Sequence, residues 1–164
     1  MIESLQKLIH ALREELQHYG ELLARLDHQQ ELVVRRAPQD LLQSTADIEA
    51  QCQVIYDARR ERFERQREVS QRLQLEAEAE FAEIIPLLPQ DYRPLVSALV
   101  QENNELLIRV QQRSRQNHLL LSRSLELMSR LIGTLLPSGS PVYTGKGNIV
   151  GTILPTSSRY QATG

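Results

Sequence analysis

Apolar residues recur at alternating steps of four and three over the first part of the chain, which is the pattern of a helix packed along a partner. The repeat consists of Leu5, Ile9, Leu12, Leu16, Tyr19, Leu23, Leu26, Gln30 and Val33. A helix over residues 2–36 would be roughly 50 Å long at about 1.5 Å per residue. Because so long a helix is stabilised mainly by packing of its apolar side, the pattern predicts a long partner beside it.

A second helix is predicted to begin at Pro38, because Ala37 is disfavoured in helical geometry before a proline while proline suits the first turn. Its repeat reads Leu41, Thr45, Ile48, Cys52 and Ile55, then Arg59, Arg62 and Gln66, then Val69 and Leu73. We expect this helix to cover 38–78, with a short extension or separate turn to 88. Its polar middle is expected to pack poorly, and Cys52 to be an inert residue of the packed face.

A third helix is predicted over 91–136, with Asp91 as N-cap and Pro94 in the first turn, where no intrahelical donor is lost. Near its end, apolar residues occupy an arc of roughly 180° on a helical wheel, whereas a helix on one side of a bundle shows about 100°. These residues are Leu120, Leu121, Leu125, Leu127, Met128, Leu131, Ile132, Leu135 and Leu136. The surplus apolar surface requires cover from a partner or from the chain itself.

The chain therefore reads as all-α, an elongated antiparallel bundle of three long helices with coiled-coil character over residues 1–136. Five of the seven glycines and three of the seven prolines fall in residues 137–164. That composition resists regular helix and is typical of a linker or docking tail. A small hairpin around Gly145 to Gly147 is the alternative interpretation of the tail.

Charge and apolar run length exclude several classes of protein. The formal net charge is -2, and Glu61, Glu64 and Glu68 interleave with the arginines between residues 59 and 67. This pattern favours a solvated helix face over a nucleic-acid surface. The chain shows no signal-peptide block and no apolar run of the ~18 residues needed to cross a bilayer, and it holds one cysteine, so we expect a cytoplasmic protein without membrane insertion.

No catalytic or metal chemistry is predicted from the motifs. His10, Glu14 and His18 share the i,i+4 spacing of metal ligands, but they lie opposite the apolar repeat and no complementary motif occurs on another helix. The Gly145-Lys146-Gly147 triplet lacks the glycine spacing and the Ser/Thr of a phosphate loop. The sequence thus predicts no enzyme, no metal site and no cofactor.

Two motifs near the C-terminus resemble those of the FlgN family of flagellar export chaperones. Asn117-His118-Leu119-Leu120-Leu121 is similar to the Asn-x-x-Leu-Leu signature near the end of the family's last long helix. Tyr143 with Gly147 is similar to its Tyr-x-x-x-Gly tail motif. The resemblance also covers the leucine-rich first helix and the helix after Pro38.

The resemblance implies a chaperone that binds the C-terminal amphipathic helices of the hook-filament junction proteins FlgK and FlgL, prevents their premature assembly and delivers them to the flagellar type III export gate, FlhA. The last helix would receive the client, and Tyr143 would help to dock the loaded chaperone on the gate. The implied client-binding residues are Asn117, Leu121, Leu125, Met128, Ile132 and Leu135.

Other interpretations of the same residues stay open. The leucines, Met128 and Ile132 could be ordinary core, Asn117 could set the register of a helix pair, and Tyr143 could be an incidental tail residue. At the level of the whole chain, the alternative is a coiled-coil scaffold or assembly subunit of another secretion or motility machine, which would self-associate through the first helix. A helical metal enzyme is the remaining alternative.

Overall fold

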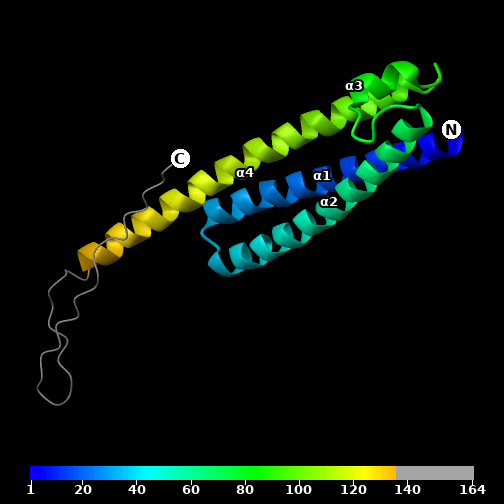
Figure 1. Cartoon of the computed structure of the whole chain (residues 1–164). Helices are drawn as coiled ribbons and strands as arrows, with labels where there is room; N and C mark the ends of the chain where they lie inside the picture. Colours follow the sequence, from blue (N-terminus) through cyan, green and yellow to red (C-terminus); the bar gives the residue numbers. More distant parts are fainter. Residues whose placement is uncertain (136–164) are drawn as a thin grey trace, which may run out of the picture. The chain divides into compact units, whose positions relative to one another are not determined.

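The computed structural model describes residues 1–135, and the side chains of residues 1–132. Its elements are the α-helices α1 (Ile2–Arg35), α2 (Pro38–Arg72), α3 (Phe81–Ile84) and α4 (Arg93–Leu135) and the 3-10 helix η1 (Ile85–Leu87) (Figure 1). Every regular element of these residues is helical, so the predicted all-α class is confirmed. The chain divides into two compact units, Met1–Arg123 and Ser124–Gly164. The division falls inside α4, whereas the predicted boundary after residue 136 lies outside the described residues.

In the first unit, α1 is the central helix of the core. It contributes twelve buried residues, against six from α2. One apolar cluster joins its N-terminal half to α2, to the turn formed by α3 and η1, and to α4. It is built around Leu5, Leu8, Leu12, Val69, Ile84, Leu88 and Val96. A second cluster, formed by Tyr19, Leu22, Leu26, Ile55 and Val110, continues the core along α1. The long partner that the α1 repeat required is thus supplied by α2 and α4.

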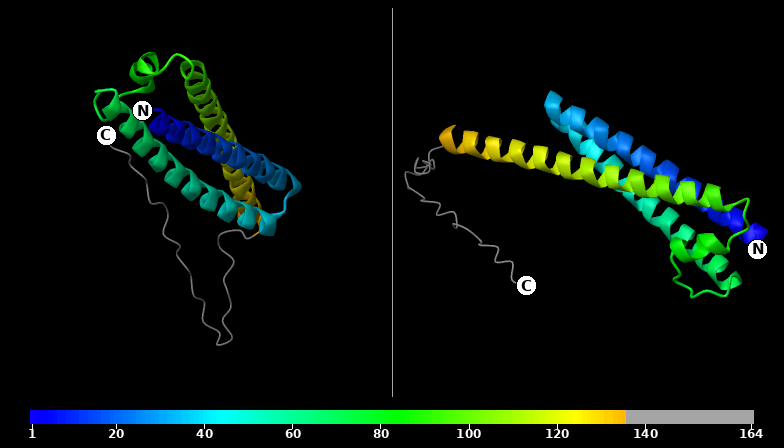
Figure 2. Two further views of the ribbon diagram at one scale, coloured as in Figure 1. Left: turned by 90° about the vertical axis from the view of Figure 1, so that its right-hand side faces the viewer. Right: turned by 90° about the horizontal axis from the view of Figure 1, so that it is seen from above.

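Figures 1 and 2 show the course of each helix in this unit, and polar contacts between the helices agree with it. Ser4 bonds to Glu68, whereas Gln29 bonds to Thr45, so α1 and α2 are antiparallel. The Asn103 side chain donates to the Leu12 carbonyl and that of Asn117 to the Leu26 carbonyl, so α4 runs parallel to α1. The three helices follow an up-down-up order.

The helix predicted over 38–78 ends six residues early, at Arg72. Gln74 has a left-handed backbone, with φ at 60°. Its amide donates to the Gln71 carbonyl, and the Leu75 amide donates to the Ser70 carbonyl. This bond pair is the Schellman helix end, which usually carries glycine at the left-handed position. Glutamine in that place gave no stop signal, so the predicted end was wrong.

The predicted extension to residue 88 is a separate turn and not a continuation of α2. It comprises α3 and η1, and α3 is opened by a capping box between Glu80 and Glu83. α4 begins at Arg93, so Asp91 is not its N-cap. The Tyr92 amide donates to the Pro89 carbonyl, which places Asp91 within the preceding turn. Pro94 lies in the first turn of α4, as predicted.

The polar middle of α2 packs against α1, contrary to expectation. Glu15 of α1 is buried and accepts hydrogen bonds from Tyr19, at 2.9 Å, and from Arg62, also at 2.9 Å. Arg62 in turn donates to Gln66 at 2.8 Å, and Gln66 donates to the Ala79 carbonyl at 2.8 Å. Burial, with the nearby charge of Glu15, raises the pKa of Tyr19 to about 12. Because Glu15 and Arg62 have these partners, both can lie between the helices, although the apolar repeat predicts that charged residues face solvent.

The face of α2 that meets α1 follows the predicted repeat at Ile55, Gln66 and Val69 and departs from it in the first half of the helix. Its buried residues are Ser44, Gln51, Ile55, Gln66, Val69 and Ser70. Cys52 and Thr45 are exposed, so the assignment of Cys52 to the packed face was wrong. The reason at Cys52 is that the neighbouring Gln51 is the buried residue, since its amide donates to the His18 carbonyl and to Glu21 on α1.

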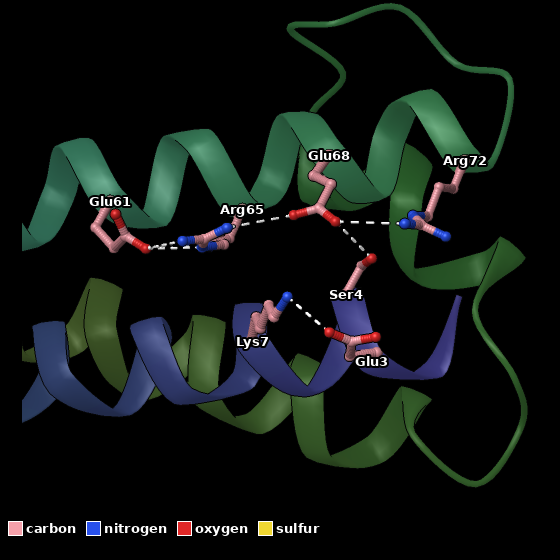
Figure 3. Close-up of polar contacts among 7 residues, drawn as sticks. All are labelled: Glu3, Ser4, Lys7, Glu61, Arg65, Glu68 and Arg72. Atoms are coloured by element: carbon pink, nitrogen blue, oxygen red, sulfur yellow. Dashed lines mark hydrogen bonds and ion pairs between the residues drawn. The ribbon is translucent and has the colours of Figure 1, made fainter.

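The interleaved arginines and glutamates near the end of α2 form ion pairs, as the charge pattern indicated (Figure 3). Arg65 lies 2.6 Å from Glu61 and 3.4 Å from Glu68, and Arg72 lies 3.6 Å from Glu68. Glu68 also accepts a 2.7 Å hydrogen bond from Ser4 of α1. That bond, aided by Arg65, lowers the pKa of Glu68 from its ordinary value of 4.5.

Candidate functional site

The most conspicuous surface of the described residues is an apolar helix face in the second unit. Five large apolar side chains between residues 125 and 132 are 58% to 66% exposed. They are Leu125, Leu127, Met128, Leu131 and Ile132, and we refer to them as the 125–132 face. Large contiguous apolar patches on a monomer usually mark a binding surface, so this face is the candidate site.

Local sequence explains why these exposed residues are helical. Leucine, methionine, glutamate and arginine are strong helix formers. Glu126 and Arg130 form an ion pair at i,i+4 in the favourable acid-first order. At about 100° per residue, Leu125, Met128 and Ile132 form one row, and Leu127 with Leu131 forms a second row beside it. The two rows make a broad stripe that can contact a partner helix.

Such a stripe binds an amphipathic helix by burying its apolar face. Anchor residues at i, i+3 and i+7, as in Leu125, Met128 and Ile132, are the spacing of helix-in-groove recognition. Full burial of one such side chain contributes roughly 1.5–3 kcal/mol. Neighbouring Ser129 and Glu126 supply a polar border that can fix the orientation of a partner.

The structure separates the predicted client-binding residues into three groups. Leu125, Met128 and Ile132 are exposed, so the structure does not use them as core. Leu121, in the first unit, is half-buried, and Leu135 is helical with a side chain outside the described set. Tyr143 and the whole predicted tail lie beyond the described residues. Asn117 is set apart from all of these, because it is only 1% exposed and faces α1.

Three exposed leucines were missing from the set of predicted site residues. Leu127 and Leu131 belong to the wide apolar arc and were passed over because only one row was chosen. The i,i+4 spacing of this pair was the signal that could have included them. Leu119 is also exposed, but the helical wheel places it on the side of α4 opposite the 125–132 face.

The titratable residues considered for metal chemistry lie on the surface or in ion pairs. His10 pairs with Glu14 at 3.3 Å, and His18 lies 3.6 Å from Glu21. Within residues 1–135, no three histidine, cysteine, aspartate or glutamate side chains are grouped as metal ligands would be. None of the helices in this part of the chain has the length and apolar character needed to cross a membrane.

The packed helical unit and the exposed apolar helix face together define the class, an all-α protein that exposes an apolar helix face. Within that class the chain belongs to the FlgN family of flagellar export chaperones, because the family model described as FlgN protein matches residues 1–151. This is a chaperone family and not a family of enzymes. No curated protein and no solved structure matched the chain in the corresponding comparisons.

Proposed function

We propose that this chain is a cytoplasmic type III export chaperone that binds the C-terminal amphipathic helices of the hook-associated proteins FlgK and FlgL. The observation that carries the proposal is the exposure of the 125–132 face in a member of a flagellar export chaperone family. Leu125, Met128 and Ile132 are the proposed anchors. Leu121 and Leu135 lie one turn before Leu125 and close to one turn after Ile132, and the proposal keeps both as flanking contacts.

The 125–132 face supplies part of the binding free energy that this role needs. Each face residue that passes from about two-thirds exposed to buried contributes roughly 1–2 kcal/mol, and five contribute roughly 5–10 kcal/mol. Association costs offset part of this sum, so the client must supply further contacts to reach micromolar affinity, near -8 kcal/mol. While the client helix is bound, its apolar face is covered, and this prevents premature assembly of the client.

The proposal assigns delivery to a separate segment. Tyr143, in the predicted tail 137–164, is the proposed docking residue for the export gate FlhA, on the strength of the Tyr-x-x-x-Gly resemblance. Binding and delivery then use adjoining parts of the chain. Tyr143→Ala should leave client affinity unchanged and weaken gate recruitment in a pull-down, and equal recruitment by both proteins removes Tyr143 from this role.

The client surface is tested by charge insertion. Leu125→Asp and Met128→Asp should each weaken binding to FlgK and FlgL C-terminal segments at least tenfold in a titration, because a carboxylate cannot be buried against an apolar helix. Leu119→Asp is the matched control, since Leu119 is equally apolar and exposed but lies on the opposite side of α4. Helicity measured by circular dichroism should be the same in all three. Client binding that survives both face variants rules out this surface.

The scaffold alternative makes a different prediction. A scaffold that self-associates through α1 should form oligomers that survive both face substitutions. The apolar repeat of α1 is already packed against α2 and α4, which disfavours this use of it. Sedimentation analysis of the intact chain distinguishes the two functions.

A further inference from the structure

One layer of the first unit joins all three long helices through side-chain hydrogen bonds. Asn117 of α4 donates from Nδ2 to the Leu26 carbonyl at 2.7 Å and to Gln29 Oε1 at 3.0 Å. Gln29 of α1 donates from Nε2 to Thr45 Oγ1 of α2 at 3.3 Å. The Thr45 hydroxyl in turn donates a hydrogen bond to the Leu41 carbonyl at 2.9 Å. We call this chain of donors the Asn117 relay.

The contact of Asn117 with α1 is repeated two heptads earlier. Asn103 donates to the Leu12 carbonyl at 3.0 Å, and fourteen residues separate Asn103 from Asn117 as fourteen separate Leu12 from Leu26. Val96 and Val110 fill the buried positions of the same heptad row. Asparagine therefore alternates with valine along the α4 row that meets α1.

This arrangement costs stability and provides register. The Oδ1 atoms of Asn103 and Asn117 are buried without a hydrogen-bond partner. A leucine at either position would avoid that cost, whereas a buried asparagine in a heptad row restricts how two helices align. Gln29 restricts the alignment of α4 with α1 further, because the buried Asn117 can bond to this side chain only when the two residues lie at the same level.

Asn117 also marks the end of the packed part of α4. Among α4 residues through Ile132, it is the last one that is buried, and the residues from 122 to 132 are all exposed. The side chain is directed to α1 and not to solvent, so a client helix at the surface has no access to it in this structure.

We infer that Asn117 is a positioning residue, which aligns α4 with α1 and α2 through Gln29, and that it makes no contact with the client. The inference uses the proposed function only to name the client. It gives the asparagine of the Asn-x-x-Leu-Leu signature an internal role. The adjoining exposed residues are left for binding.

The test compares both ends of the Asn117 to Gln29 bond. Asn117→Ala and Gln29→Ala should each raise amide hydrogen exchange between residues 26 and 45 by roughly tenfold, the effect of one buried hydrogen bond. The double variant should show little further increase, because both changes break the same relay. Asn104→Leu, at an exposed asparagine of the same helix, is the matched control and should leave exchange unchanged.

Client titration with the same variants separates positioning from contact. Asn117→Ala and Gln29→Ala should change affinity for the FlgK and FlgL segments equally, and by less than threefold. A tenfold loss with Asn117→Ala alone, or unchanged exchange in both variants, overturns the inference. Thr45→Val, nearly isosteric and at an exposed site, supplies the exchange comparison where an alanine variant fails to fold. Client binding that survives both Leu125→Asp and Met128→Asp rejects the proposed client surface and leaves the relay result intact.

Discussion

Removal of the Glu15 carboxylate is the sharpest test of how α2 is held against α1. The Glu15 side chain is 5% exposed and that of Arg62 is 13% exposed, and they are joined by a 2.9 Å bond from Arg62 Nε. Glu15→Leu leaves the guanidinium and the Tyr19 hydroxyl without this acceptor. Loss of one partner of a buried ion pair costs about 3–5 kcal/mol. Because Arg62 keeps its bond to Gln66, we expect the lower end, about 3 kcal/mol.

Urea unfolding followed by circular dichroism measures this cost. With a slope of about 2 kcal/mol per molar urea, a loss of about 3 kcal/mol lowers the midpoint by roughly 1.5 M. Glu14→Leu is the matched control, because Glu14 is the adjacent residue and its side chain is 49% exposed. The control should shift the midpoint by less than about 0.3 M, since surface substitutions usually stay within about 0.5 kcal/mol.

The double variant Glu15→Leu with Arg62→Met tests whether the unpaired guanidinium causes the loss of stability. Replacing both charges with apolar side chains removes the unpaired guanidinium, and most of the lost stability should return. A deficit of about 1 kcal/mol should persist, because the Tyr19 hydroxyl still lacks its acceptor. The reasoning is refuted if Glu15→Leu costs no more than Glu14→Leu, or if the double variant is less stable than Glu15→Leu.

Two further predictions concern stability. Gly20→Ala should raise the free energy of unfolding by about 0.5–1 kcal/mol, because an added Cβ meets only Leu106 Cδ2, at 4.0 Å, and glycine is unfavourable inside a helix. Ala24→Gly, at an exposed site of α1, should lower the free energy of unfolding by a similar amount. A Gly20→Ala protein less stable than the parent would contradict this prediction. For pH, the lowered pKa of Glu68 means that its contribution is present above about pH 4.5 and is lost as the pH falls, whereas the raised pKa of Tyr19 means that its contribution is present below about pH 10 and is lost towards pH 12. The melting temperature of Glu68→Gln should therefore fall less steeply than that of the parent as the pH is lowered. The melting temperature of Tyr19→Phe should fall less steeply as the pH is raised towards 12. Profiles parallel to that of the parent would exclude these two groups as the cause.

The helix positions followed from the sequence better than the contacts did. The α1 bounds were predicted to within one residue, because an apolar repeat and Pro38 define them. Five of the nine repeat positions were also right, since Leu5, Ile9, Leu12, Tyr19 and Leu26 are buried. At three other places the burial is offset by one residue, because Glu15, Leu22 and Gln29 are buried and the next residues, Leu16, Leu23 and Gln30, are half-buried. Glu15 and Gln29 have partners on other helices, which no pattern within α1 can reveal.

The same limit applies to the candidate site. An apolar surface wider than one packing contact needs was predictable from the arc, although a core role for its residues stayed open. The role of Asn117 was not, since an asparagine beside three leucines reads equally well as a surface ligand or as a buried register residue. The difference depends on Leu26 and Gln29, about ninety positions away in the sequence, as the separations of 91 and 88 residues show.

The distribution of polar and apolar residues explains why both features occur in one chain. Glu15, Gln29, Asn103 and Asn117 are buried, whereas Leu125, Leu127 and Met128 are exposed. A sequence selected for stability alone would exchange the two sets, because buried leucine stabilises a core and exposed leucine invites association. With an apolar row throughout α4, registers that draw its exposed leucines onto α1 would compete with the native one. Polar residues in the interior penalise those registers, and the leucines stay at the surface, as the proposed client binding requires.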